Sequence, residues 1–140
     1  MSPERIVRSF AVGAATGLRT MTGPAAAFAV RKNGNWNWPV LLGALGEYII
    51  DKLPATPPRT RPAGLAARAI AAGFAAASVA EFDEERWTCA ALGIAGAMGS
   101  AFAGRAFRAE AARRHVPDVL AALLEDAAAI ALARAAVPRR

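Results

Sequence analysis

The chain is poor in the residues that most often carry chemistry. It has one cysteine, Cys89, and one histidine, His115, in 140 residues. A single cysteine excludes an intrachain disulfide and a cysteine metal cluster, and a lone loop histidine gives no support to a histidine-based metal site. The sequence also contains no nucleophile-elbow or phosphate-loop motif. We therefore expect a protein that is not an enzyme and that holds no cofactor.

Charged residues are missing from several long stretches. Residues 88–104 carry no charge, 63–80 carry only Arg68, and 36–50 carry only Glu47. The hydrophobic share, 55%, is above that of ordinary soluble domains. A helix that is apolar all round lies in lipid or is fully buried, and so small a chain can hardly bury several of them. The pattern favours an integral membrane protein; an alanine-rich soluble bundle is the alternative.

The sequence predicts an all-α fold in one membrane domain, 1–140. No segment has the pattern of a strand. Apolar stretches separated by Gly, Pro and acidic interruptions predict five short helices, over 6–30, 37–53, 63–81, 88–112 and 117–136. The first apolar run is cut by Arg19 after a short distance, which argues against a cleavable signal peptide. Helix 37–53 is short enough either to span the membrane or to re-enter it.

Two parts of the chain repeat each other. Residues 11–20 align with 91–100 without a gap, and 39–47 align with 117–125, with Gly13/Gly93, Pro39/Pro117 and Glu47/Glu125 as the matches that alanine content does not explain. We expect repeat A over about 6–57, a central helix over about 63–81 and repeat B over about 88–138. A single intervening crossing would invert the second copy relative to the first, as in many small transporters.

Five crossings and the basic residues predict the orientation. The side of the membrane that holds the N-terminus would carry most of the basic residues, and the other side would carry fewer, together with the acidic run 81–85. The basic residues on the side of the N-terminus are Arg5, Arg8, Lys52, Arg59, Arg61, Arg105, Arg108, Arg113 and Arg114. This bias favours a multi-pass protein of the inner (plasma) membrane with a cytoplasmic N-terminus. The net charge of +6 then reflects topology and contacts with anionic lipid headgroups, not nucleic-acid binding. Trp36, Trp38 and Trp87 fall at the expected outer boundary.

Ionisable residues within apolar helices are costly and are therefore paired, hydrated or functional. Glu47 and Asp51 lie one helical turn apart, and the repeat would bring them to Glu125 and Asp126 near the membrane midplane. Such carboxylates would share protons or bind a cation, and the sequence does not identify which metal ion, if a metal, that cation would be. Alternatively, Arg19 or Arg68 pairs with them and fixes the helix register.

The first helix contains an unusual segment before Pro24. Proline removes a backbone donor and obstructs the carbonyl of Thr20, so the helix should kink or break there. Freed carbonyls and the hydroxyls of Thr20 and Thr22 would then be able to coordinate a small cation, or Arg19 to receive an anion. The alternative is a proline kink satisfied by neighbouring helices.

Small residues recur at spacings of four on single helical faces. Gly13 and Gly17 form one such face, and Gly96, Ser100 and Gly104 form another. These faces are typical of close helix packing in membranes, and we expect them to pack a homodimer.

Three strings, 17–20, 47–54 and 123–126, resemble the uncharacterised bacterial and plant membrane-protein family DUF4126 (domain of unknown function 4126). The most specific of them is Glu47, Asp51, Lys52 and Pro54 at the end of the second predicted helix. The fourth helix is less polar here than is usual for that family. The resemblance implies a membrane location and no established activity.

Together these features predict a small transporter or channel for a cation, protons or another small solute. Its site would comprise Glu47, Asp51, Glu125 and Asp126, with Arg19, Thr20 and Thr22 beside them. The alternative is a non-catalytic scaffold or assembly subunit whose buried charges fix helix packing; a membrane-embedded enzyme comes third.

Overall fold

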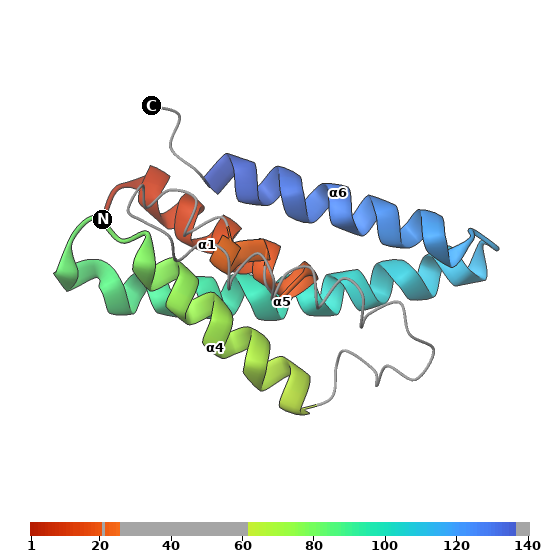
Figure 1. The fold of residues 1–140 in the computed structure, drawn as a ribbon, viewed down its shortest axis with the longest axis horizontal. Helices are drawn as coiled ribbons and strands as arrows, with labels where there is room; N and C mark the ends of the chain where they lie inside the picture. The colour runs from red at the N-terminus through yellow and green to blue at the C-terminus, as the bar shows by residue number, and fades with distance from the viewer. Residues whose placement is uncertain (21, 26–61, 137–140) are drawn as a thin grey trace.

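A computed structural model describes residues 1–20, 22–25 and 62–136. This part of the chain is all helical and contains no strand. It comprises α1 (Pro3–Leu18), α4 (Pro62–Ser78), the short helix η1 (Asp83–Glu85), α5 (Arg86–Arg113) and α6 (Asp118–Ala136), with residues 22–25 also helical (Figure 1). The all-α prediction is confirmed, and three predicted helices match α4, α5 and α6 closely. The predicted helix 37–53 lies outside the described residues.

Proline and helix-capping geometry set the ends of these helices. Pro3 and Pro62 occupy the first turns of α1 and α4, where a missing amide hydrogen costs nothing. At the end of α5, His115 adopts a left-handed φ of 55°, and its amide and that of Val116 donate to the carbonyls of Ala112 and Ala111. This is the Schellman arrangement, with histidine in the position usually taken by glycine. His115 therefore has a local structural role in turning the chain into α6.

The predicted first helix, 6–30, is wrong in its extent. Helix α1 ends at Leu18, and Arg19 is extended, with φ −140° and ψ 115°. Residues 22–25 are again helical, and the amide of Thr22 donates to the carbonyl of Arg19 at 3.0 Å. A continuous helix would have brought the Pro24 ring against the carbonyl of Thr20. The break predicted from Pro24 is confirmed.

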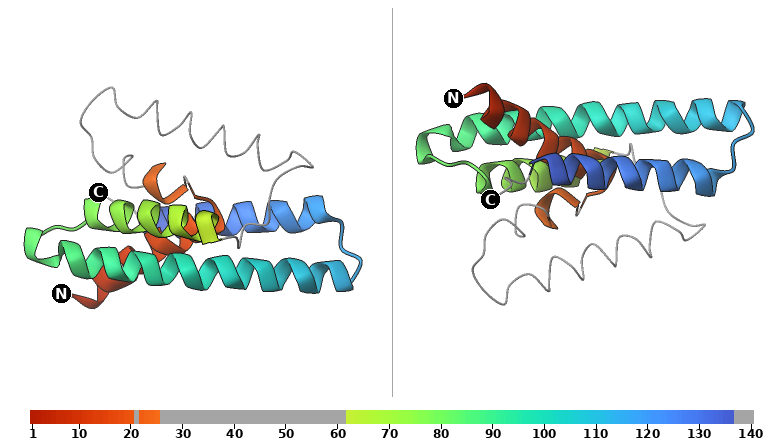
Figure 2. Two further views of the ribbon diagram at one scale, coloured as in Figure 1. Left: turned by 90° about the horizontal axis from the view of Figure 1, so that it is seen from below. Right: turned by 90° about the horizontal axis from the view of Figure 1, so that it is seen from above.

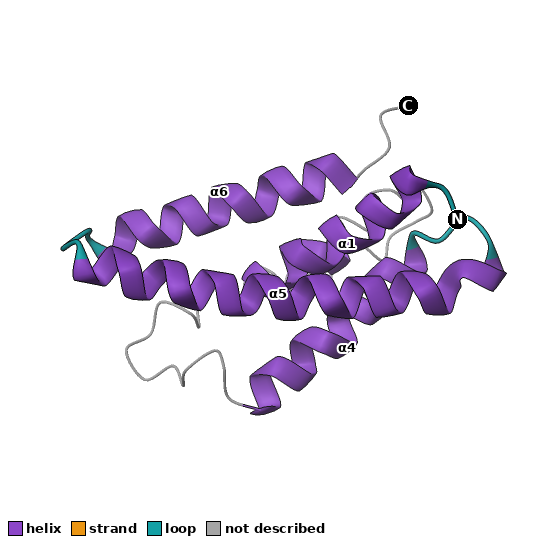
Figure 3. Cartoon of the chain, turned by 180° about the vertical axis from the view of Figure 1, so that it is seen from behind, coloured by secondary structure: helices purple, strands orange, loops and turns teal. Residues whose placement is uncertain are grey.

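Helix α1 is the central element of the described bundle. It packs against α4, α5 and α6, whereas α5 and α6 diverge from their connecting turn and leave space between them for α1 (Figures 1 and 3). Two further views show α1 crossing α5, with both helices running from the end that carries residue 1 (Figure 2). Helices α4 and α6 run in the opposite direction.

The directions of α1 and α5 depart from the inverted repeat. These helices carry the aligned segments 11–20 and 91–100, and equivalent helices of an inverted repeat point oppositely across the membrane. Here they run the same way and meet at equivalent residues: a Cβ on Gly13 would overlap the carbonyl of Gly93, and one on Gly17 would overlap the backbone of Ala97. This pair therefore does not show the inverted relation. The second aligned pair involves residues outside the described part.

The interior of the bundle is built from small side chains. Most buried hydrophobic residues in the described part are alanines, and the largest fully buried side chains are Val12, Thr16, Cys89 and Ser9. Large apolar side chains lie outside instead: Trp87 is 85% exposed, Ile70 74% and Val119 71%. This arrangement reverses the distribution of an ordinary soluble core, in which leucine, isoleucine and phenylalanine are the most buried.

The small-residue faces serve packing within one chain. A Cβ on Gly96 would lie within 2.9 Å of the amide nitrogen of Ala14, and Ser100 lies against Gly17. These residues are therefore occupied by the crossing of α1 and α5. The structure thus uses within one chain the faces that were expected to pack a homodimer, and the homodimer itself stays a prediction.

Candidate functional site

The candidate site lies where α1, α5 and α6 converge near the α5–α6 turn. Glu125 and Asp126 are on the buried face of α6, which continues through Ala121, Ala129 and Ala133. Consecutive residues of a helix point about 100° apart. The two carboxylates consequently reach different neighbours, one on α5 and one at the end of α1.

Asp126 pairs with Arg19. The Nε of Arg19 donates to Oδ1 of Asp126 at 2.5 Å, and Nη2 of the same guanidinium also contacts Oδ1. Both side chains are almost completely buried, at 8% and 10% exposure. Arg19 is able to reach Asp126 because α1 ends at Leu18 and the extended backbone of Arg19 directs the chain away from the helix axis.

Glu125 pairs with Arg108 of α5. The Nε and Nη2 of Arg108 donate to Oε2 of Glu125 at 2.8 and 2.5 Å. The carboxylate is 5% exposed and the guanidinium 28%, and Asp118 lies 3.8 Å from Nη1 of Arg108. Gly104 makes room for this pair, since a Cβ there would lie 2.7 Å from Oε1 of Glu125.

Arg108 is a residue of this candidate site that the sequence analysis did not include. The row of small residues Gly96, Ser100 and Gly104 was recognised, and one more step of four residues leads to Arg108. A charge that continues a packing face must be buried or partly buried, so it needs a partner on the neighbouring helix. That spacing was the available signal. Arg68, the other arginine considered, is also buried but lies on α4.

The predicted depth of the carboxylates, near the membrane midplane, stays a prediction. In the structure Glu125 lies against Gly104, the last residue of the uncharged run 88–104 of α5. The first two turns of α6 lie beside the charged end of α5, because the short turn at 114–117 brings the helices together there. The pair of Glu125 with Arg108 is thus beside the charged end of α5.

The other predicted site residues have different outcomes. Thr20 is partly buried at the break of α1, and Thr22 starts the helical segment that follows it. Glu47 and Asp51 lie outside the described residues, so their predicted approach to Glu125 and Asp126 remains a prediction. Within the described part, no three Asp, Glu, His or Cys side chains form a group suited to a metal ion.

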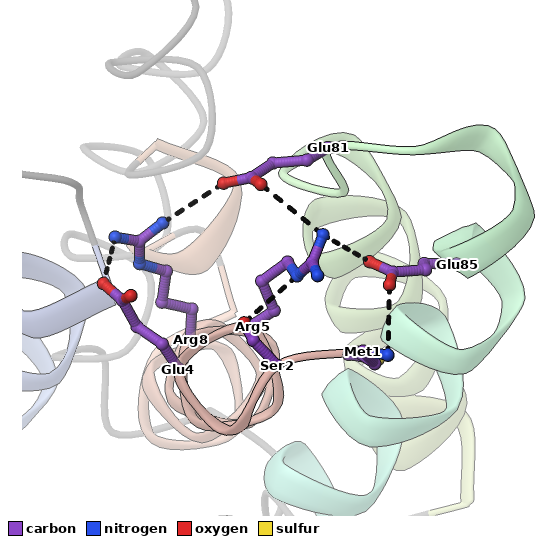
Figure 4. Close-up of polar contacts among 7 residues, drawn as sticks. All are labelled: Met1, Ser2, Glu4, Arg5, Arg8, Glu81 and Glu85. Carbon is purple, nitrogen blue, oxygen red and sulfur yellow. Dashed lines mark hydrogen bonds and ion pairs between the residues drawn. The ribbon is translucent and has the colours of Figure 1, made fainter.

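A second charged cluster lies at the opposite end of the bundle (Figure 4). It joins the start of α1 to the segment between α4 and α5: Nη1 of Arg5 lies 3.6 Å from Glu81 and 3.4 Å from Glu85, and Arg8 lies 3.6 Å from Glu81. The amino group of Met1 is 3.4 Å from Glu85. We call this set, with Glu4 and Ser2 beside it, the terminal cluster.

The terminal cluster corrects the predicted arrangement of charges. The five-crossing scheme placed Arg5 and Arg8 across the membrane from the acidic run 81–85, yet these residues are in contact. Helix α4 runs antiparallel to both α1 and α5, so the start of α1 and the α4–α5 connection meet at one end (Figure 1). The end of α6 at Ala136 lies at that same end.

Comparisons with known proteins give no further constraint. No model of a protein family matches the chain, and no curated protein or solved structure matches it. The resemblance to DUF4126 accordingly stays a prediction from the sequence.

Proposed function

We propose that this protein is an integral membrane protein with a non-catalytic, structural role, in which buried ion pairs fix the packing of a small helical scaffold. The observation that carries the proposal is the reversed distribution of side chains. Alanine and glycine fill the helix contacts, while Phe74, Phe102 and Leu124 are each more than half exposed. Lipid tails solvate large apolar side chains, and small residues allow close helix approach in a membrane.

Helix length is compatible with this location. Helix α5, with η1 before it, is long and apolar enough to cross a membrane by length and composition, and only 33% of its apolar window is buried. Its uncharged run, 88–104, is about 25 Å long at a rise of about 1.5 Å per residue, close to the hydrocarbon thickness of a bilayer. Among the described helices it alone meets this criterion, and the apolar part of α4, Gly64–Ser78, is shorter.

The ion pairs support a structural role. Glu125 and Asp126 are paired with guanidiniums from different elements, so α6 is tied both to the end of α1 and to α5. A carboxylate already paired in this way is a poor site for a free cation. Two such pairs hold three elements in one register, as a scaffold requires.

Ion transport is the second candidate, favoured by the break in α1. Interrupted helices in transporters expose backbone groups beside charged side chains. The break at Arg19 and Thr20 lies next to Asp126, with Thr22 just beyond it. A transported ion would have to separate Arg19 from Asp126 during its passage.

Two measurements test the membrane location. The protein, expressed in cells, should stay in the membrane pellet after an alkaline carbonate wash, whereas an alanine-rich soluble bundle should be released. Two single-cysteine variants, Ser2→Cys and Glu84→Cys, are made in a Cys89→Ala background. In intact membranes both should react with a membrane-impermeant thiol reagent added from the same side. Labelling from opposite sides would contradict the terminal cluster.

Reconstitution separates the scaffold from the transporter. The purified parent protein and its Asp126→Asn variant should be placed in liposomes and assayed for flux of protons, alkali metals and halides. A scaffold shows no flux above empty liposomes in either form. Flux by the parent that is lost in a folded Asp126→Asn variant would establish transport and overturn the structural role.

A further inference from the structure

A groove lies between α4 and α5 on the outside of the described bundle. It has a volume of about 620 Å³. Small residues, among them Gly73, Ala77 and Ala90, line it together with the large apolar side chains Ile70, Phe74, Trp87 and Ile94. Phe74 and Trp87 are 59% and 85% exposed, so the groove opens outward between large side chains.

The groove fits within one leaflet of a bilayer. Its lining along η1 and α5 runs from Asp83 to Ile94, and the apolar part, from Trp87 to Ile94, is about 10 Å long at a rise of about 1.5 Å per residue. Half of a hydrocarbon core is about 15 Å, so this apolar part covers about two thirds of one leaflet. The polar lining residues, Asp83 and Arg86, are at one end next to Trp87, and the lining is apolar from there to Ile94. Tryptophan is enriched where apolar chains meet headgroups.

The charges at the mouth distinguish among headgroups. Nε of Arg86 lies 3.1 Å from Oδ1 of Asp83, and both side chains are well exposed, at 55% and 88%. The neighbouring Glu81 and Glu85 are matched by Arg5, Arg8 and the amino terminus. The mouth therefore presents one cation and one anion side by side. Glu84, also exposed nearby, adds negative charge that would repel an anionic headgroup.

We propose that this groove binds one acyl chain of a zwitterionic phospholipid whose headgroup carries a primary ammonium, as in phosphatidylethanolamine. The phosphate pairs with Arg86, and the ammonium donates hydrogen bonds to Asp83. A quaternary choline group has no N–H to donate, and the uncharged hydroxyls of phosphatidylglycerol give Asp83 weaker hydrogen bonds than a charged ammonium does. The inference rests on the proposed membrane location and adds a specific lipid partner to it.

Native mass spectrometry of the detergent-purified protein tests the proposal. The protein is mixed with equal amounts of phosphatidylethanolamine, phosphatidylcholine and phosphatidylglycerol that carry identical acyl chains. We expect one phosphatidylethanolamine to be retained per chain. Arg86→Gln should reduce its retention about fivefold, because one arginine near a lipid phosphate contributes about 1 kcal/mol. Asp83→Asn should remove the preference for phosphatidylethanolamine over phosphatidylcholine.

Matched controls come from the other end of α5. Arg113 and Glu110 form the same kind of exposed pair three residues apart, at 2.7 Å, and lie outside the groove. Arg113→Gln and Glu110→Gln should leave lipid retention unchanged. Ala77→Leu, which fills the groove, should lower retention of all three lipids, and circular dichroism checks that it still folds.

Three results would overturn the inference: a preference for phosphatidylglycerol in the parent, equal loss in the Arg113→Gln control, or a lipid-free dimer as the main species. The last would identify a second copy as the occupant of the groove. These outcomes are distinct from failure of the proposed function, since a protein released by carbonate washing is not in the membrane at all.

Discussion

The two charged clusters of this bundle contain similar residues in contrasting surroundings. The pairs of Arg19 with Asp126 and Arg108 with Glu125 lie where three helices converge, and three of these four side chains are no more than 10% exposed. In the terminal cluster, Glu81 is 55% and Glu4 73% exposed, and contact distances reach 3.6 Å. Solvent screens an exposed pair, whereas a buried charge that loses its partner remains uncompensated. The clusters should therefore differ strongly in their effect on stability.

Asp126→Asn should have the largest effect. The amide keeps the size of the side chain but removes the negative charge that faces the buried Arg19, and breaking a buried pair costs about 3 to 5 kcal/mol. Unfolding in mixed detergent and SDS micelles, followed by circular dichroism, measures the change. Asp118→Asn on the same helix is the control, since Asp118 is 85% exposed. Equal effects of the two substitutions would show that burial of the carboxylate does not decide the loss of stability.

Glu125→Gln should have an intermediate effect, about 2 kcal/mol. Its partner Arg108 is 28% exposed, so water compensates part of the lost charge. A double-mutant cycle with Arg108→Gln measures the coupling between the two residues. The double variant should be less destabilised than the sum of the single variants. Strict additivity would show that the pair contributes no interaction energy.

Glu85→Gln in the terminal cluster should cost about 1 kcal/mol or less. Glu85 is only 18% exposed, but its contacts to Arg5 and Met1 are 3.4 Å long. Raising the salt concentration to 1 M should remove most of the difference between the variant and the parent, because the Debye length falls to about 3 Å. The effect of Asp126→Asn should persist under the same conditions. If high salt reduced the effect of Asp126→Asn more than that of Glu85→Gln, the description of one pair as buried and the other as screened by solvent would be refuted.

Glu4→Gln should have the smallest effect, within about 0.5 kcal/mol. Glu4 pairs with Arg8 at 2.6 Å across one turn of α1, and its side chain is exposed. Pairs of this kind contribute only about 0.3 to 0.5 kcal/mol. The same unfolding assay, run beside the Glu85→Gln variant, makes the comparison. A larger loss of stability for Glu4→Gln than for Glu85→Gln would mean that the exposure of a side chain does not decide its contribution within the terminal cluster.

Local features of the sequence predicted α4, α5 and α6 and the break after α1. The uncharged run 88–104 gave α5, the apolar stretch after Pro62 gave α4, and Pro24 predicted the break that appears at Arg19. The small-residue faces also predicted close packing correctly, because a missing side chain permits backbone approach whatever the partner. Buried ion pairs involving Arg19 were among the alternatives, and Asp126 is its partner.

Only the tertiary structure decided which faces meet. The crossing scheme separated Arg5 from Glu81, which are in contact, because such a scheme depends on how the helices are directed in space. Pairing Arg108 with Glu125 requires the α5–α6 turn to align the helices, and pairing Arg19 with Asp126 requires α1 to enter between them. Helix formation follows from local hydrogen bonding and composition, whereas these contacts join residues far apart in the chain and depend on packing that no local pattern encodes.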